Sequence, residues 1–364
     1  MSGPEPRPGI LKAPAYVGGA SKAEGANRSI KLSSNECALG CSDKAVEAYQ
    51  TVSTELHRYP DGGATELRQA LAARHNLEMD RIVCGDGSDE VLYMLTRAYA
   101  GQDEEVLFHQ HGFVVYRLAC LGAGATPTTA PEIDCRADVD AMLAAVTDKT
   151  RIVFLTNPGA VGTYVTEEEV RRLHAGLRDD ILLVIDEAYA EYVTAEDFSS
   201  SIDLARESHN IVITRTFSKA YGLAAVRLGW CYAPAPVADV LNRLRGPFNV
   251  TAPAQAAGIA ALDDQYFVDR VVAHNEEWRS WLETSLKDQG YGVLPSVTNF
   301  MMVKFDDEDD ANAAQAHLEK HGILVRDMRA YGLGDHLRIT VGLGEDCRAV
   351  DEALSSFRSQ DQAG

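Results

Sequence analysis

The sequence has no long apolar run. None of its segments reaches the roughly 18 consecutive apolar residues of a membrane span, and its N-terminal segment lacks the apolar core of a secretory signal. It also has no basic excess, because 54 acidic and 34 basic side chains give a formal net charge of −20. Phosphate backbones and anionic lipid surfaces attract basic proteins. We therefore expect a cytoplasmic protein that binds neither nucleic acid nor membranes.

Cysteine and histidine are not arranged for metal binding. The sequence has seven cysteines and no C-x-x-C pair. Cys37 and Cys41 lie close together but have no nearby histidine or second cysteine pair that would complete a zinc site. His109 and His111 lie two residues apart at the end of an expected strand, without a third ligand. We expect reduced thiols and no metal.

Short apolar runs alternate with helical stretches between residues 81 and 233. These runs are rich in valine, isoleucine and leucine, and they are continuous rather than alternating with polar residues. Such runs are typical of strands buried on both faces of a parallel sheet, with helices as the crossovers. The runs are RIVCG (81–85), EVLFH (105–109), RIVFLT (151–156), ILLVID (181–186), IVITRT (211–216) and LGWCYA (228–233).

Beyond residue 250 the strand-like runs are sparser, and a long helical stretch over residues 253–287 precedes them. This pattern favours a smaller α+β domain, and a chain of 364 residues is long enough for two domains. We predict an α/β fold with a mostly parallel central sheet flanked by helices. The expected divisions are an N-terminal segment at residues 1–30, a large domain at 31–245 and a small C-terminal domain at 246–364.

Ligands of open α/β sheets bind beyond the carboxyl ends of the strands. Lys219 follows one such strand, within TRTFSKAYGLAAVRLGW (214–230). A lysine there can simply be exposed. Pyridoxal phosphate, however, requires a lysine that condenses with its aldehyde, together with hydroxyl and guanidinium groups for its phosphate dianion. Thr216, Ser218 and Arg227 supply such groups nearby.

Asp186 ends the apolar run ILLVID, where an unpaired carboxylate would be costly. Opposite a pyridine nitrogen it would keep the cofactor ring protonated, which makes the ring an electron sink. Tyr189 follows three residues later and could donate to the phenolic oxygen of the cofactor. The alternative is an aspartate that only caps the next helix.

Ser88 and Asp89 open a helix directly after Gly-Asp-Gly in VCGDGSDEVLYML (83–95). The free amide groups of a helix N-terminus bind phosphate, although a plain helix cap has the same composition. The glycine pattern matches neither a dinucleotide-binding motif nor a P-loop. Phe113 could stack on a flat heteroaromatic ring or pack in the core. Arg326 and Arg338 lie in strand-like runs and are expected to face a carboxylate or phosphate.

The order of these segments resembles the fold-type I, class I/II pyridoxal-phosphate-dependent aminotransferases, and within them the histidinol-phosphate aminotransferase family. The resemblance extends from about Tyr16 to Gly344. The matching segments are KLSSNE (31–36), RYPDGGATELRQALA (58–72), GDGSDE (85–90), DEAYAEYV (186–193), RTFSKAYGLAAVRLGW (215–230), PFNV (247–250) and GILVRDMRAYGLGDHLRIT (322–340).

The resemblance implies a role for each candidate. Lys219 would join the cofactor aldehyde, Asp186 would pair with the ring nitrogen, Tyr189 would contact the phenolic oxygen and Phe113 would cover the ring. The cofactor phosphate would be held by the amides of Ser88 and Asp89 with Thr216, Ser218 and Arg227. Tyr59 would reach the cofactor of the other subunit in a homodimer with shared active sites. Arg326 and Arg338 would bind the anionic end of the substrate, and Tyr16 would close over it.

The sequence departs from the family pattern in the loop Asn157-Pro158-Gly159-Ala160-Val161-Gly162-Thr163. This loop is one residue shorter than the family's, and the family's second Asn-Pro pair falls on Gly159-Ala160. Either Asn157 contacts the phenolic oxygen of the cofactor, or Tyr189 does so alone.

The resemblance implies a ping-pong transamination between an amino donor and a 2-oxo acid, with histidinol phosphate and 2-oxoglutarate as the expected pair. An aromatic amino-acid aminotransferase uses the same chemistry. A lyase similar to threonine-phosphate decarboxylase shares the fold, and a non-enzymatic regulatory protein that binds the cofactor is a further alternative. The sequence leaves these alternatives open.

Overall fold

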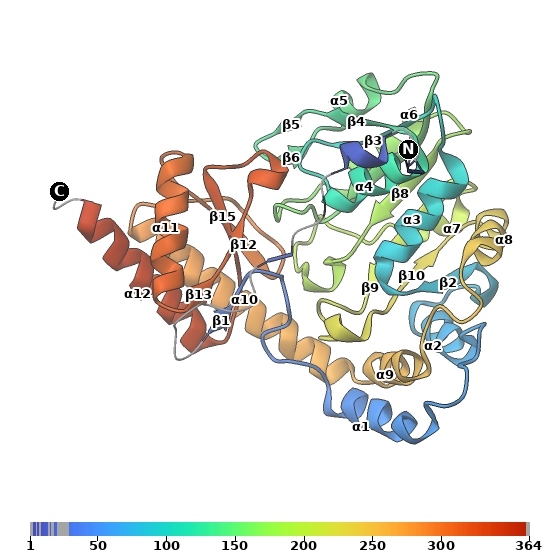
Figure 1. Ribbon diagram of the computed structural model, residues 1–364, viewed down its shortest axis with the longest axis horizontal. Helices are drawn as coiled ribbons and strands as arrows, with labels where there is room; N and C mark the ends of the chain where they lie inside the picture. Colours follow the sequence, from blue (N-terminus) through green and yellow to red (C-terminus); the bar gives the residue numbers. More distant parts are fainter. Residues whose placement is uncertain are drawn as a thin grey trace.

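A computed structural model describes residues 3–4, 6, 9–13, 15, 18–19 and 29–361 of the chain. Figure 1 shows two groups of elements, one around a large sheet and one around a smaller sheet near the C-terminus, with a long helix running between them. Within the described part of the chain, no helix combines the length and apolar character needed to cross a membrane.

The large sheet has seven strands, and the described residues confirm the predicted α/β class. β10 runs antiparallel to both of its neighbours, whereas the remaining pairs are parallel. In sheet order the strands are β2 (Ile82–Gly85), β10 (Gly229–Tyr232), β9 (Ile211–Thr216), β8 (Leu182–Asp186), β7 (Thr150–Thr156), β3 (Glu105–His109) and β4 (Thr126–Ala130).

Both faces of this sheet are buried. Along β7, Val153 and Leu155 belong to the core on one face, and Ile152 and Phe154 belong to the core on the other. This alternation explains why the strands read as continuous apolar runs. The first core includes α1 (Asp43–Val52), α2 (Thr65–His75), α5 (Val139–Ala144), α6 (Glu167–Gly176), α7 (Ile202–Glu207) and α9 (Ala252–Asp263); the second includes α3 (Gly87–Tyr99), α4 (Val114–Ala123) and α8 (Ala235–Leu244).

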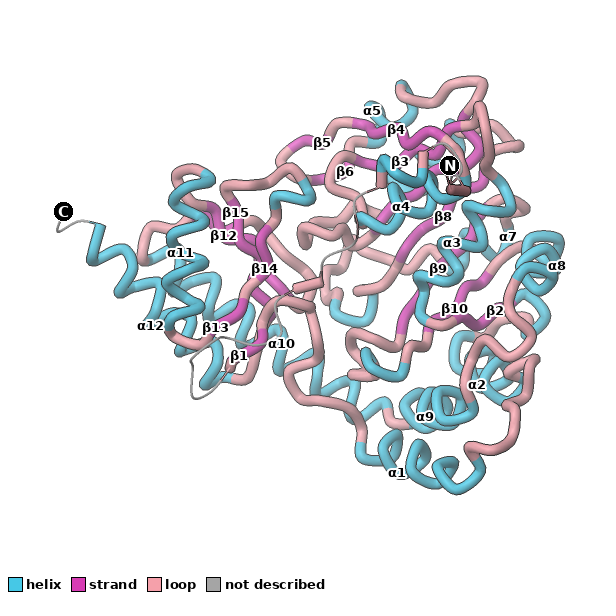
Figure 2. The backbone as a smooth tube through the Cα atoms, viewed as in Figure 1, coloured by secondary structure: helices cyan, strands magenta, loops and turns pink. Residues whose placement is uncertain are grey.

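The smaller sheet is antiparallel and has four strands in the order β11 (Gly292–Val293), β12 (Phe300–Lys304), β15 (His336–Thr340) and β14 (Arg326–Asp327). It shares a core with α11 (Glu308–Lys320), α12 (Gly344–Asp361) and the C-terminal part of α10 (Gln265–Asp288). Figure 2 shows α11 and α12 at the C-terminal end of the molecule. β1 (Ile30–Lys31) pairs in parallel with β13 (Ile323–Leu324), which brings the N-terminal segment to this core.

Short elements complete the described chain. β5 (Glu132–Ile133) and β6 (Arg136–Ala137) form an antiparallel hairpin next to β4 in the sequence. The 3-10 helices are η1 (Ile10–Lys12), η2 (Ser53–Glu55), η3 (Met79–Arg81), η4 (Ala190–Tyr192), η5 (Ala224–Val226) and η6 (Arg329–Tyr331).

Three elements differ from the sequence-based expectation. The helical stretch at 253–287 is two helices, because Asp264 has a non-helical backbone and accepts a hydrogen bond from Ser42. β4 was not expected, since Thr-Pro-Thr-Thr-Ala has the polar composition of an exposed edge strand. The antiparallel direction of β10 has no signal in its sequence. The domain boundaries stay a prediction; α9 packs with the core of the large sheet.

Candidate active site

A cavity of about 270 Å³ lies where β7, β8 and β9 end, and residues of the smaller sheet form its opposite wall. Thr156, Asp186 and Thr216 are the last residues of these three strands, which agrees with ligand binding at the carboxyl ends of an open sheet. The predicted site residues that line this cavity are Ser88, Asp89, Phe113, Asp186, Tyr189, Thr216, Ser218, Lys219, Arg227, Arg326 and Arg338.

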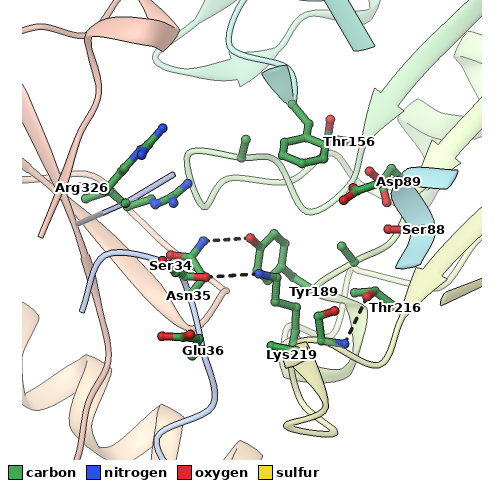
Figure 3. A pocket seen from close by; sticks show the side chains of 18 of the residues that line it. Ser34, Asn35, Glu36, Ser88, Asp89, Thr156, Tyr189, Thr216, Lys219 and Arg326 are labelled. Carbon is green, nitrogen blue, oxygen red and sulfur yellow. Dashed lines mark hydrogen bonds between the residues drawn. The ribbon is translucent and has the colours of Figure 1, made fainter. Parts of the chain in front are cut away.

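Lys219 presents its amine inside the cavity. Its Nζ lies 3.4 Å from the carbonyl oxygen of Ser34 and 5.6 Å from the centre of the Tyr189 ring. Figure 3 shows Ser34 and Asn35 facing Lys219 and Tyr189. Burial, assisted by the positive charge of Arg338, lowers the pKa of Lys219 to about 8. About a tenth of this amine is therefore uncharged at pH 7 and can act as a nucleophile or base.

Asp186 is a buried carboxylate that accepts two hydrogen bonds. The hydroxyl of Tyr116 donates to Oδ2 at 2.8 Å, and the hydroxyl of Thr214 donates to Oδ1 at 3.0 Å. Burial raises the pKa of Asp186 to about 6, although both hydrogen bonds favour the ionised form. A cationic partner in the cavity would lower the pKa of Asp186 again, because an opposite charge favours the ionised carboxylate.

The first turn of α3 and Arg227 lie together at the cavity and present groups suited to an anion. The N-cap residue of α3, Asp86, makes no side-chain cap, so among the described residues it leaves the first amides of the helix free for a ligand. Ser88 lies in this turn, and Nη1 of Arg227 lies 3.4 Å from the Ser218 hydroxyl. A Cβ on Gly87 would lie 2.3 Å from Nη2 of Arg227. Only glycine leaves room for this guanidinium beside the helix N-terminus.

Two further guanidinium groups face the cavity from the smaller sheet. Arg338 is 9% exposed, and its buried Nε has no hydrogen-bond partner within the described structure. Its guanidinium lies 5.0 Å from the centre of the Phe300 ring. Arg326 pairs with Arg338 across β14 and β15. A buried cation with an unsatisfied donor is suited to an anionic ligand, since an arginine does not lose its charge.

Asn35 is a cavity residue that the sequence did not single out. Its Nδ2 donates to the Tyr189 hydroxyl at 2.8 Å. The Asn35 backbone is held in a left-handed conformation (φ 56°), and its amide donates to the Thr340 hydroxyl at 2.9 Å. Asn35, in the loop after β1 and bonded to Thr340 of β15, therefore orients Tyr189. Glu36 and Tyr331 also line the cavity and were not expected.

Comparison with known proteins agrees with this geometry. A family model described as aminotransferase class I and II matches residues 27–357. The chain belongs to this family. It is 54% identical to the histidinol-phosphate aminotransferase of Paramagnetospirillum magneticum, over 98% of this chain and 99% of that protein. It is 51% identical to the enzyme of the same name from Rhodospirillum centenum, over 98% of this chain and 99% of that protein.

A solved structure resembles this aminotransferase along its length. It is the crystal structure of histidinol-phosphate aminotransferase from Sinorhizobium meliloti in complex with pyridoxal-5'-phosphate. The TM-score is 0.89 at 27% sequence identity, and the match covers 99% of both chains. The family resemblance found in the sequence is thus confirmed, as is the fold.

Two predicted site residues of this aminotransferase, Asn157 and Tyr59, do not line the cavity. Asn157 is buried and bonded both ways to Val165, donating to its carbonyl at 3.1 Å and accepting from its amide at 3.0 Å. The structure therefore corrects the expectation that Asn157 faces the cofactor; Ala160 of the shortened loop lines the cavity instead. Tyr59 is 82% exposed and stacks on Phe248 at 4.5 Å, away from the cavity. Tyr16 lies outside the described residues.

The expectation of no metal is not contradicted in the described residues. His109 and His111 both bond to the carboxylate of Glu132, and no group of three or more metal-ligating side chains lies together in the described ranges. The acidic run 306–310 begins α11, where Asp307 caps the helix by accepting from the Asp310 amide. The cysteines form no disulfide among the described residues.

Proposed function

We propose that this chain transfers the amino group of histidinol phosphate to 2-oxoglutarate, with pyridoxal 5'-phosphate as its cofactor. The observation that carries the proposal is the cavity itself, which holds a half-buried amine of lowered pKa, Lys219, and a buried carboxylate, Asp186. The relatives at 54% and 51% identity bear this enzyme's name over nearly their whole length.

The residues present fit this cofactor. The uncapped first turn of α3, Ser218 and Arg227 would hold a phosphate dianion, and the space beside Gly87 is kept open for the guanidinium. Phe113 would cover the ring, and Asp186 would face its nitrogen. When bound, the cofactor supplies an aldehyde that condenses with amines and a protonated ring that accepts an electron pair.

The protein supplies charge and proton transfer around that chemistry. Asp186 accepts hydrogen bonds from the hydroxyls of Tyr116 and Thr214, which favour its carboxylate form, and would stabilise positive charge at the ring nitrogen. Lys219, mostly uncharged above about pH 8, would take the proton from the α-carbon of the bound amine. Tyr189, oriented by Asn35, presents its hydroxyl on the same side of the cavity as Lys219.

Arg326 and Arg338 would bind the anionic end of either substrate. Histidinol phosphate ends in a phosphate and 2-oxoglutarate in a carboxylate, and the two arginines can pair with both types of oxyanion. The unsatisfied Nε of Arg338 is ready for such a partner. The buried position of Arg338 makes this pairing stronger than one at the surface, because water screens it less.

A donor screen with the purified protein tests the proposal. We expect visible absorbance from the bound cofactor, bleached by histidinol phosphate and restored by 2-oxoglutarate. Lys219→Ala should lose the aldehyde-linked absorbance and lower turnover by at least about a thousandfold. Lys44→Ala, at an exposed side chain, is the matched control and should change neither. Unchanged colour and turnover in Lys219→Ala would overturn the proposal.

The same screen separates the competing substrates. A higher kcat/KM for phenylalanine or tyrosine than for histidinol phosphate would identify an aromatic amino-acid aminotransferase. Carbon dioxide release in a single turnover without a 2-oxo acid would identify a lyase. A cofactor band that no amino donor bleaches would favour a regulatory protein.

We infer that the enzyme is a homodimer in which Tyr59 reaches the partner's cofactor. Tyr59, Phe248 and Leu56 form an exposed apolar patch, with Leu56 68% exposed. Mixing Lys219→Ala and Tyr59→Ala subunits tests the sharing of sites. If sites are shared, half of the dimers carry one intact site, and activity recovers to roughly a quarter of wild type. Without sharing, the mixture has only the average activity of the two variants.

A further inference from the structure

Tyr116 contacts the active-site carboxylate without lining the cavity. It lies in α4 and is fully buried, with its ring stacked on Phe154 at a centroid distance of 4.4 Å. Its hydroxyl lies 2.8 Å from Oδ2 of Asp186 and 2.9 Å from Oγ1 of Thr156. The phenol therefore joins the ends of two neighbouring strands, β7 and β8, at the carboxylate that would face the cofactor ring.

The direction of these hydrogen bonds follows from the number of protons. An ionised carboxylate only accepts, so the single hydroxyl proton of Tyr116 points to Asp186. The Tyr116 oxygen can then only accept from Thr156, whose hydroxyl must be the donor. The Thr156 proton consequently points to Tyr116 and the Tyr116 proton to Asp186, which favours the charged form of Asp186.

A buried histidine and glutamate anchor the far end of this chain of hydrogen bonds. The Thr156 amide donates to Nε2 of His109 at 3.3 Å, so that nitrogen must carry a lone pair. The ring proton of His109 is therefore on Nδ1, which donates to Oε1 of Glu132 at 2.5 Å. His111 also bonds to Glu132, through its amide at 2.9 Å and its ring at 2.6 Å.

Glu132 is well suited to fixing the tautomer of His109. Burial raises the pKa of Glu132, but the hydrogen bonds from His109 and His111 outweigh it and lower the pKa to about 2. The carboxylate is thus ionised at neutral pH and keeps His109 in one tautomer. Glu132 belongs to the β5–β6 hairpin, which this contact fastens to the end of β3.

We propose that Tyr116, directed by Thr156 and anchored through His109 by Glu132, is a positioning residue that holds Asp186 as an oriented carboxylate against the cofactor ring nitrogen. The inference rests on the proposed function, because it acts through the pairing of Asp186 with that nitrogen. It assigns the His109–Glu132 pair a role in the active site in place of a metal.

The test compares two ligands that differ at one atom. Cofactor-free protein is titrated with pyridoxal 5'-phosphate and with its 1-deaza analogue, in which carbon replaces the ring nitrogen, and each dissociation constant is measured. Tyr116→Phe keeps the ring on Phe154 but removes the donor to Asp186. We expect about tenfold weaker binding of pyridoxal 5'-phosphate and less than about twofold for the analogue.

Tyr99→Phe is the matched control. Tyr99 packs, partly buried, against the same core cluster as Tyr116, on the neighbouring helix α3. It should leave both dissociation constants unchanged. Equal weakening of both ligands by Tyr116→Phe would show a merely structural role and overturn the proposal.

Two further substitutions probe the rest of the chain and cover the case in which Tyr116→Phe does not fold. Thr156→Val removes the donor to Tyr116, and Thr156→Ser restores it. In the valine variant alone we expect about threefold weaker binding of pyridoxal 5'-phosphate, without a matching change for the 1-deaza analogue. Glu132→Gln allows His109 to carry its proton on Nε2, opposite the Thr156 amide, and should have the same nitrogen-specific effect.

The outcomes separate this inference from the proposed function. If wild-type protein does not bind pyridoxal 5'-phosphate, the proposed function fails. If it binds the cofactor and the two ligands respond equally in Tyr116→Phe, Thr156→Val and Glu132→Gln, the function stands and the positioning role of Tyr116 is wrong.

Discussion

The Arg227 guanidinium occupies the space that any side chain on Gly87 would need. A Cβ built on Gly87 would lie 2.3 Å from Nη2 of Arg227 and 3.2 Å from its Cζ. Gly87 also has a positive φ of 75°, which disfavours every other residue. The glycine at the start of α3 thus leaves room for Arg227, the cation proposed to bind the cofactor phosphate.

Gly87→Ala is therefore expected to displace Arg227 and weaken cofactor binding. Loss of one bidentate charge-assisted contact to a phosphate corresponds to about 10–100-fold in the dissociation constant for pyridoxal 5'-phosphate. Gly124→Ala is the matched control, because Gly124 also has a positive φ of 85° but no atom within 4 Å of its Cβ position. It should reduce stability without changing cofactor affinity. Equal effects of both substitutions on affinity would contradict this account.

The pKa of Lys219 predicts the pH dependence of cofactor loading. Because burial lowers this pKa to about 8, the reactive free amine increases about tenfold per pH unit below pH 8 and levels off above it. The rate at which visible absorbance appears on mixing with pyridoxal 5'-phosphate should follow this curve.

The positive charge of Arg338 contributes to this lowering, so Arg338→Gln should raise the pKa of Lys219 and move the loading curve to higher pH. Arg329→Gln removes an exposed arginine paired with Asp327 and serves as the control, with no shift expected. An unmoved curve in Arg338→Gln would show that Arg338 does not act on the Lys219 amine.

Much of the large sheet could be predicted because its strands are buried on both faces. Ile152 and Phe154 face one core and Val153 and Leu155 the other, so the run is apolar throughout. β4 has exposed and half-buried threonines at the sheet edge and therefore reads as a loop. The same topology made the cavity predictable, since Asp186 and Lys219 follow strands that end at one edge.

Other parts of the site depend on partners that are distant in sequence. Asn35 contacts Tyr189, 154 residues away, and Thr340, 305 residues away. No local pattern indicates such contacts. Asn157 follows a strand, as a site residue should. Its loop folds back, however, with the Gly159 amide donating to the Thr163 carbonyl at 2.7 Å, and the Asn157 side chain hydrogen-bonds to the backbone of Val165.

Asp186→Asn should stabilise the cofactor-free protein. The same substitution should abolish the activity of the cofactor-loaded enzyme. The folded-state pKa of Asp186 is raised from 3.8 to about 6. Between these values the folded protein holds a proton that the unfolded chain has released, so this group lowers stability as pH rises through the window. At pH 7 the asparagine variant should be more stable by about 1–3 kcal/mol.

Thermal unfolding of the cofactor-free protein measures this difference. It should shrink as pH falls towards 4, where wild-type Asp186 is protonated in the folded state. Asp179→Asn, at a fully exposed side chain, should show no such pH-dependent difference. With pyridoxal 5'-phosphate bound, the order should reverse, because the asparagine cannot pair with a ring cation. A gain in stability that is independent of pH would contradict the assignment to Asp186.

Arg215 and Glu187 form a buried ion pair. They are the sequence neighbours of the cavity residues Thr216 and Asp186. Nη2 of Arg215 lies 2.7 Å from Glu187, and the two side chains are 8% and 1% exposed. Nη1 lies 3.1 Å from Glu191. Arg215→Met leaves both carboxylates buried without their cation, so the free energy of unfolding should fall by about 3–5 kcal/mol in urea titrations.

Arg243→Met removes an exposed pair with Asp239 and should change the free energy of unfolding by less than about 1 kcal/mol. Adding Glu187→Gln to Arg215→Met should recover part of the loss, because the cost arises from the unpaired carboxylate rather than from the missing arginine. If the double variant is as unstable as the sum of both single variants, Arg215 and Glu187 do not act as a pair. Recovery would instead show that Arg215 and Glu187, at the ends of β9 and β8, stabilise the fold as a coupled pair.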